Sequence, residues 1–312
     1  MDYNYPPYRS EVPQYQNFQT DLVGTPKQKV HQQFPIINIV LFLLTVITTL
    51  YAGSKLEGGD PFRRIQDIYS GIPFSVTLLA IIGCHEFGHY FMCKKHGVSA
   101  TLPYFIPAPP PLFIGTLGAV IKIRDPITNN RALLDIGAGG PLAGILIAIP
   151  ALFIGMNSSM VIEIASHPGI QFRDPLLMKL ISRIVIGEIP EGFGASINSV
   201  AFAGWIGLFV TAFNLLPIGQ LDGGHIAYAV IGNKQGWLGY TVFISLFFLA
   251  FFWAGWLVLI IIAALIKIRH PSGMTALEPL DSRRKFIAFL SLLVFILCFV
   301  PVPSPGTGIL NW

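Results

Sequence analysis

Apolar residues along this chain gather in long runs that are separated by shorter polar segments. Seven such runs cover residues 35–53, 74–93, 133–156, 198–217, 237–251, 253–268 and 285–302. Most of them approach the roughly 20 residues that a helix needs to cross about 30 Å of hydrocarbon. The pattern therefore predicts an all-α integral membrane protein with about seven transmembrane helices.

The stretch 237–268 allows two interpretations, because it is too long for one ordinary span and short for two. A turn at Trp253-Ala254-Gly255 would divide it near its middle. We predict two short helices here, and one long helix is the alternative.

Two segments between the runs are not simple loops. Residues 101–123 are apolar but contain five prolines, so a continuous helix cannot form there. The β-branched part at 118–123 predicts a strand, and the whole segment predicts a re-entrant β-hairpin element between helices 2 and 3. Backbone of this kind is tolerated at membrane depth only against protein or a wet cavity. Within the outside segment 157–197, residues 175–186 predict a short interfacial helix.

The chain divides into a tail and one membrane-embedded domain. Residues 1–34 are rich in Tyr, Pro and Gln without hydrophobic periodicity, which predicts a disordered tail. This tail has the composition of neither a signal peptide nor an organelle transit sequence. The domain is expected to cover residues 35–312, and we expect no inserted module such as a PDZ domain.

Composition supports the membrane assignment. Hydrophobic residues make up 53% of the chain and charged residues 12%, whereas a soluble domain carries about 25% charged residues. The net charge of +4 comes without a basic run, which excludes a nucleic-acid binder. With the amino end inside, 14 of the 20 Lys and Arg residues fall on the cytoplasmic side, as the positive-inside bias requires.

The sharpest chemical signal is His85-Glu86-Phe87-Gly88-His89, inside the second run. On a helix, residues four apart differ by about 40° around the axis, so His85 and His89 leave the same face. This spacing allows both to bind one Zn²⁺, with Glu86 beside it as general base. Three hydrogen-bonded side chains without a metal are the structural alternative. They would leave unexplained a Glu that costs about 2.5–3.5 kcal/mol near the centre of a span.

A third zinc ligand must come from elsewhere. Cys93 lies about 12 Å further along the helix than His85. His96 comes one position late for the pattern of soluble zinc proteases, which places a third His ten residues after the first. Asp222 is the candidate, since Pro217 interrupts the helix before it and a fourth position would stay open for water. An ordinary Asp-Gly-Gly turn is the alternative. His225 could assist the site or replace Asp222 as ligand.

The two motifs together resemble the site-2 protease family of intramembrane zinc metalloproteases. That family pairs a His-Glu-x-x-His helix with an Asn-x-x-Pro-x-x-x-x-Asp-Gly helix, and both patterns stand in full at 85–89 and 214–223. The resemblance implies that His85, His89 and Asp222 bind Zn²⁺ and that Glu86 is the catalytic base. It further implies that Asn214 helps to bind substrate or the oxyanion.

The resemblance covers most of residues 35–300, including a re-entrant β element at 102–119 and a third-helix motif at 139–144. It implies a zinc metalloendopeptidase for regulated intramembrane proteolysis, which hydrolyses peptide bonds in transmembrane segments of membrane-protein substrates. We expect the unwound substrate to pair with the edge strand at 116–123. We also expect a multi-pass protein of a bacterial plasma membrane, with the active site toward the cytoplasmic side.

Two other functions fit part of this pattern. A membrane zinc protease of another class would take a Glu as third ligand, but the available acids lie outside or in turns: Glu163, Glu188, Glu191 and Glu278. A zinc-binding transporter or receptor without hydrolytic activity would share the spans and the buried polar groups, but it has no use for an unligated Glu86. Substrate identity, a prior site-1 cleavage and oligomeric state stay open.

Overall fold

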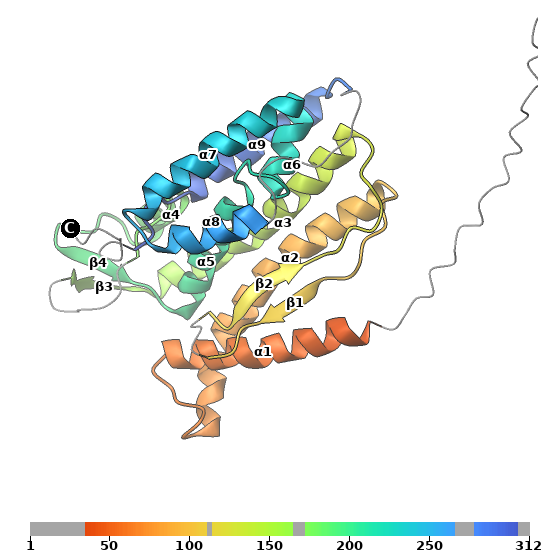
Figure 1. The fold of residues 1–312 in the computed structure, drawn as a ribbon. Coiled ribbons are helices and arrows are strands. Elements are labelled where there is room, and N and C mark those ends of the chain that lie inside the picture. The colour runs from red at the N-terminus through yellow and green to blue at the C-terminus, as the bar shows by residue number, and fades with distance from the viewer. Residues whose placement is uncertain (1–34, 111–113, 165–171, 266–277, 305–312) are drawn as a thin grey trace, which may run out of the picture. The chain divides into compact units, whose positions relative to one another are not determined.

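The computed structural model of this protein describes residues 35–110, 114–164, 172–265 and 278–304 (Figure 1). The predicted tail, 1–34, lies outside the described residues. Helices dominate, and two small two-stranded antiparallel sheets complete the described fold. In chain order the elements are α1 (Ile36–Leu56), η1 (Ile65–Gly71), α2 (Ile72–Lys95), β1 (Tyr104–Pro107), β2 (Thr116–Val120), α3 (Asn130–Asn157), β3 (Met160–Glu163), α4 (Leu176–Val185), β4 (Phe193–Ser196), α5 (Ser199–Asn214), α6 (Asp222–Ile231), η3 (Gly232–Lys234), α7 (Gln235–Ala250), α8 (Gly255–Leu265) and α9 (Ser282–Cys298).

Three helices within the described residues are long and apolar enough to cross a membrane. They are α1, the continuous stretch Ile65–Lys95 that ends with α2, and α3. α5 and α8 are apolar but shorter. Length and composition therefore support three spans, and the prediction of seven goes beyond this finding.

The stretch 237–268 folds as two helices. α7 ends at Ala250 and α8 begins at Gly255, with turns between them that include Trp253. The preferred interpretation of two short helices is therefore confirmed up to Leu265, and residues 266–268 lie outside the described residues.

α2 and α3 pack with their backbones in direct contact. A Cβ placed on Gly88 of α2 would overlap the carbonyl group of Gly139 on α3. A Cβ on Gly139 would lie only 2.7 Å from Cγ of Met92 and 2.9 Å from the carbonyl oxygen of Gly88. Small residues at a helix interface allow this approach, which is how helices associate inside membranes.

α3 is the central helix, because it also packs against α5 and α6. A Cβ on Gly155 would overlap Ala201 of α5, and one on Gly137 would lie 2.9 Å from Cβ of His225 on α6. Gly137 therefore lets α3 approach α6, and Gly140, less than one helical turn further along α3, lets it approach α2. The main hydrophobic core, which includes Leu152 at 0% exposure, surrounds these contacts.

The β1–β2 hairpin lies along α1, as Figure 1 shows. The side-chain amide of Asn38 donates to the carbonyl oxygens of Leu102 and Pro103, at 3.0 and 2.9 Å. The Thr48 hydroxyl donates to the carbonyl oxygen of Gly115 at 2.6 Å. α1 thus holds the hairpin near both ends. A hairpin lies where the sequence predicted one, between helices 2 and 3, and its re-entrant position in a membrane stays a prediction.

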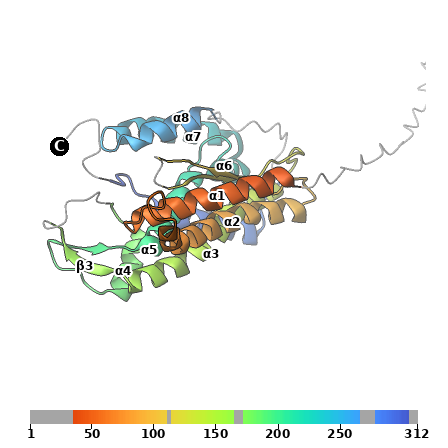
Figure 2. The ribbon, with the colours of Figure 1, turned by 90° about the horizontal axis from the view of Figure 1, so that it is seen from below.

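A second two-stranded antiparallel sheet pairs β3 with β4, with Met160 opposite Ser196 and α4 between the strands in the chain, and it was not predicted. Figure 2 shows β3 and α4 next to α5. α4 confirms the short helix predicted at 175–186, and its Met178 and Ile181 are buried in the main core. Strands of only four residues, one of them with a glycine, leave too short an alternation to be detected in the sequence.

The contact between α2 and α3 yields a matched test on one helix. We expect Gly88→Ala to lower the free energy of unfolding by about 1–3 kcal/mol, because the methyl group would push the two backbones apart. Gly83→Ala is the control, since its Cβ would meet nothing nearer than Phe105 Cζ at 3.7 Å. Unfolding of the detergent-solubilised protein measures both, and equal stability of the two variants would contradict this packing.

Candidate metal centre

Three side chains from two distant parts of the chain converge inside the helix bundle. His85 and His89 come from α2, and Asp222 is the first residue of α6. One candidate donor atom from each lies within 4.8 Å of the others, and no other such group occurs among the described residues. The two histidines are buried and Asp222 is nearly so. Sequence reasoning named all three.

The approach of Asp222 depends on an irregular turn between α5 and α6. α5 ends at Asn214, and Pro217 cannot continue a helix. Gly219 has φ +51°, a left-handed conformation that favours glycine. A Cβ on Gly223 or Gly224 would overlap carbonyl groups of this turn. The chain therefore reverses tightly and presents the Asp222 carboxylate toward α2.

α6 itself is a correction to the sequence analysis. The sequence predicted that Pro217 interrupts the helix before Asp222, and none of the seven apolar runs covers the residues that follow. Instead, Asp222 opens a new helix of 10 residues. The Asp-Gly-Gly sequence is typical of a turn, and a short helix after it gives little periodic signal.

The spacing of the donor atoms fits a tetrahedral zinc ion. Nε2 of His85 lies 3.1 Å from Nε2 of His89. The two carboxylate oxygens of Asp222 lie 3.2 Å from Nε2 of His85 and 3.3 Å from Nε2 of His89. Bond lengths of about 2.0–2.1 Å in a tetrahedron place neighbouring ligand atoms about 3.3–3.4 Å apart. Two imidazoles and one carboxylate are also a donor set of catalytic zinc sites.

A backbone carbonyl of α3 orients the His89 ring. Nδ1 of His89 lies 2.7 Å from the carbonyl oxygen of Ile136. Since a carbonyl oxygen only accepts hydrogen bonds, Nδ1 carries the proton and Nε2 presents its lone pair to the cluster. Gly140 makes room for this ring, because a Cβ there would overlap the imidazole.

Glu86 and Asn214 border the three converging side chains. Glu86 is buried, with 8% exposure, and the backbone of Ile121, just after β2, lies near its carboxylate. Nδ2 of Asn214 lies 3.4 Å from Nε2 of His85. Both residues that the sequence named as catalytic therefore stand beside the candidate ligands, and neither belongs to the donor group.

The other candidate ligands lie outside this group. His225 packs near Gly137 and is not one of the converging donors, so direct ligation gains no support. His96 bonds instead to Asp135, at 2.9 Å. The acids of the other protease class are also absent from the described donor group: Glu163, Glu188, Glu191 and Glu278.

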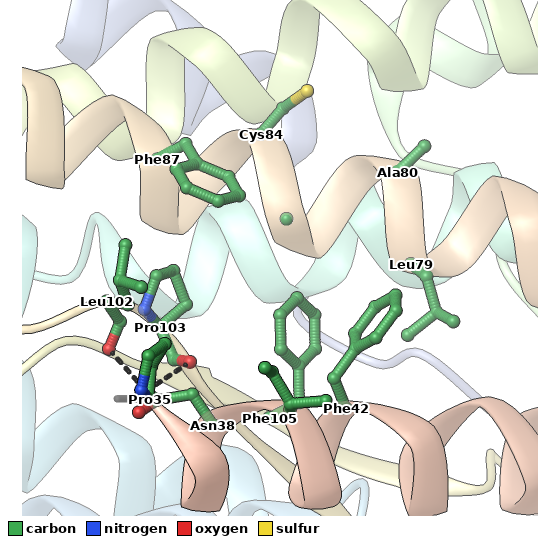
Figure 3. A pocket seen from close by; sticks show the side chains of 12 residues that line it. Pro35, Asn38, Phe42, Leu79, Ala80, Cys84, Phe87, Leu102, Pro103 and Phe105 are labelled. Carbon is green, nitrogen blue, oxygen red and sulfur yellow. Dashed lines mark hydrogen bonds between the residues drawn. The ribbon is translucent and has the colours of Figure 1, made fainter. Parts of the chain in front are cut away.

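A separate apolar cavity of about 430 Å³ lies between α1, α2 and the approach to β1 (Figure 3). Phe42 and Phe105 meet edge to face there, with ring centroids 5.1 Å apart. Cys84 and Phe87 of α2 line it, whereas His85, Glu86 and His89 do not. The cavity thus lies beside the histidine helix without opening onto the donor atoms.

Comparisons with known proteins agree with this geometry. The family model described as Peptidase family M50 matches residues 73–254, more than half of the chain. The "Probable zinc metalloprotease EGY2, chloroplastic" of Oryza sativa subsp. indica is 30% identical over 222 residues, which cover 70% of this chain and 39% of the relative. The Arabidopsis thaliana protein of the same name is 27% identical over 251 residues, which cover 78% of this chain and 44% of the relative. No solved structure matches significantly.

This chain spans about two fifths of the length of these curated relatives. The region that matches the family model includes both histidines, Glu86, Asn214 and Asp222. The relatives are named as zinc metalloproteases, and the described helices include three that are apolar and long enough to cross a membrane. The protein is therefore a membrane protein that belongs to peptidase family M50, the site-2 protease family, whose cofactor is zinc.

Proposed function

We propose that this protein is an intramembrane zinc endopeptidase that hydrolyses peptide bonds in transmembrane segments of membrane-protein substrates. The observation that carries the proposal is the meeting of His85, His89 and Asp222 within 4.8 Å on apolar helices, with a buried glutamate beside them. A zinc-binding transporter or receptor is not favoured, because the family is one of peptidases.

In this proposal His85, His89 and Asp222 hold the zinc ion. When bound, zinc supplies Lewis-acid chemistry, which acidifies water and polarises a carbonyl oxygen. The Ile136 carbonyl keeps Nε2 of His89 available as a ligand atom. Burial of both imidazoles excludes bulk water from two sides of the site.

Glu86 is proposed to move the proton. Its carboxylate accepts a proton from the attacking water, whose oxygen bonds to the scissile carbonyl carbon. The same carboxyl then donates that proton to the amide nitrogen as the carbon–nitrogen bond breaks, and an amine leaves. The backbone of Ile121 lies near this carboxylate and ties the base to the end of the hairpin.

Asn214 is proposed to stabilise the oxyanion. Its Nδ2 lies 3.4 Å from Nε2 of His85, so a carbonyl oxygen bound at the metal centre would lie close to this donor. A single such donor contributes about 3 kcal/mol to the transition state.

The hairpin offers a place for an unwound substrate. Peptide bonds inside a transmembrane helix are hydrogen-bonded to each other, so the substrate must become extended before hydrolysis. We propose that it adds as a strand to the edge of β2, the strand whose following residue, Ile121, contacts Glu86. Strand addition would thus deliver the scissile bond beside the base.

We further propose that residues 35–312 form one protease domain with seven spans and that the site faces the cytoplasm. Lys94 and Lys95 lie at the C-terminal end of α2, and His89 is closer to this end than to the start of the helix. The positive-inside bias places this end, and with it the site, on the cytoplasmic side. A bacterial plasma membrane stays a prediction without support from the curated relatives, since their names place them in chloroplasts.

Two variants distinguish the residue that moves the proton from a residue that binds zinc. We expect Glu86→Gln to retain about one zinc per chain and to lose cleavage by about 10²–10⁴-fold, because only the proton acceptor is removed. Asp222→Asn should lose both zinc and cleavage. Metal analysis of the purified protein and co-expression with single-span membrane substrates measure the two properties. Wild-type cleavage by Glu86→Gln would refute the proposed base.

Asn214 is tested against another asparagine on the same helix. We expect Asn214→Ala to reduce kcat by about 10²–10³-fold with zinc content unchanged. Asn198→Ala is the control, because Asn198 caps α5 by accepting from the backbone N–H of Ala201 at 2.9 Å. That change should cost about 1 kcal/mol of stability and leave kcat unaltered. An equal effect of both variants on kcat would argue against the oxyanion role.

A further inference from the structure

A buried carboxylate on α3 joins three helices near the metal centre. Asp135, with a side chain 7% exposed, lies 2.9 Å from Nε2 of His96, the C-cap residue directly after α2. Its oxygens also accept from the Arg284 guanidinium of α9, at 2.7 Å from Nη2 and 3.1 Å from Nε. Asp135 therefore bridges α2 and α9 from its position on α3.

Removing one partner from such a group is costly. A buried carboxylate that loses its partner stays uncompensated in a medium of low dielectric constant, whereas the two parallel bonds from Arg284 fix its orientation. Asp281 holds the same guanidinium from the other side and caps α9, accepting from the backbone N–H of Arg284 at 2.9 Å. This backbone bond, together with the guanidinium, lowers the pKa of the Asp281 carboxyl from its ordinary value.

The bridge lies in the same row of contacts as the metal ligands. Along one face of α2 follow His85, His89, Met92 and His96, at spacings of four, three and four residues. Their partners on α3 run in the opposite direction. His85 packs near Gly144, His89 near Gly140, Met92 near Gly139, and His96 bonds to Asp135.

We infer that Asp135, clamped by Arg284 and paired with His96, is a positioning residue that fixes the register of α3 against α2 and thereby orients His89. Asp135 directly precedes Ile136, whose carbonyl oxygen holds the His89 ring at 2.7 Å. The inference rests on the proposed metal site. α9 lies outside the region that matches the family model, so this clamp comes from a part of the chain beyond that match.

The sensitivity of the site to register follows from helix geometry. A slip of one residue along a helix moves it by about 1.5 Å. A slip by that full rise along the bond direction would lengthen the 2.7 Å between Nδ1 of His89 and the carbonyl oxygen of Ile136 to about 4.2 Å, which is beyond hydrogen-bond range. The ion pairs of Asp135 with His96 and with Arg284 lie at one end of the contact between α2 and α3. A slip of α3 along α2 would break them, so they oppose it.

The test compares Arg284→Gln, Asp135→Asn and the milder Arg284→Lys and His96→Gln with the wild-type protein. Arg131→Gln is the matched control, because Arg131 also lies on α3 and pairs with Glu278 at 3.3 Å, whereas Arg284 pairs with Asp135. Zinc affinity is measured by competition with a chelator on purified full-length protein, and kcat and KM are measured on a membrane substrate. Thermal unfolding shows which variants keep the native fold.

We expect Arg284→Gln and Asp135→Asn to weaken zinc affinity by about 10–100-fold, as loss of groups that orient metal ligands does elsewhere. kcat should fall with KM little changed, and Arg284→Lys and His96→Gln should lose less. The double variant of Arg284 and Asp135 should lose no more affinity than either single one, since both changes break one interaction. Arg131→Gln should stay within twofold of wild type.

Native zinc affinity and kcat in folded Arg284→Gln and Asp135→Asn would overturn the inference. It would also be overturned by an equal loss in Arg131→Gln, or by losses that simply add in the double variant. If the stronger variants do not fold, Arg284→Lys and His96→Gln decide in the same way. Wild-type protein that binds zinc without cleaving substrates would refute the proposed function, while the affinities would still test the clamp.

Discussion

The close contact of α2 with α3 is the constraint on which the rest of this structure depends. Gly88 and Gly139 allow the two backbones to touch, and Gly140 and Gly144 leave the space that the two imidazoles fill. In a membrane, where lipid is as apolar as the protein interior, such packing is the main source of helix association. The same contact places the Ile136 carbonyl against His89. Fold stability and ligand orientation therefore come from one interface.

Around this interface, the remaining elements each supply one part of the site. The turn before α6 brings a carboxylate to the two imidazoles, and α5 ends with its asparagine beside them. α1 holds the hairpin through Asn38 and Thr48, and the hairpin in turn places the Ile121 backbone at Glu86. Buried polar groups that would be costly in lipid thus satisfy one another.

Much of this could be predicted from the sequence because its signals are local. The spacing of His85 and His89, the apolar runs and the proline-rich hairpin depend on residues close in the chain. Asp222 was the candidate third ligand from the residues alone, with an ordinary turn as the alternative, and the resemblance to a family then implied the same pairing. The ion pairs of Asp135 with His96 and Arg284 escaped prediction, because they join residues 39 and 149 positions apart. α6 and the sheet of β3 and β4 were missed because their elements are short.

X-ray absorption spectroscopy of the zinc-loaded protein tests the central claim most directly, because it reports the atoms around the metal. The geometry predicts a four-coordinate ion with two imidazole nitrogens at about 2.0–2.1 Å, the remaining ligands oxygen, and no sulfur. Asp222→Asn should abolish this spectrum. A sulfur ligand, a single imidazole, or an unchanged spectrum in Asp222→Asn would contradict a zinc ion held jointly by α2 and α6.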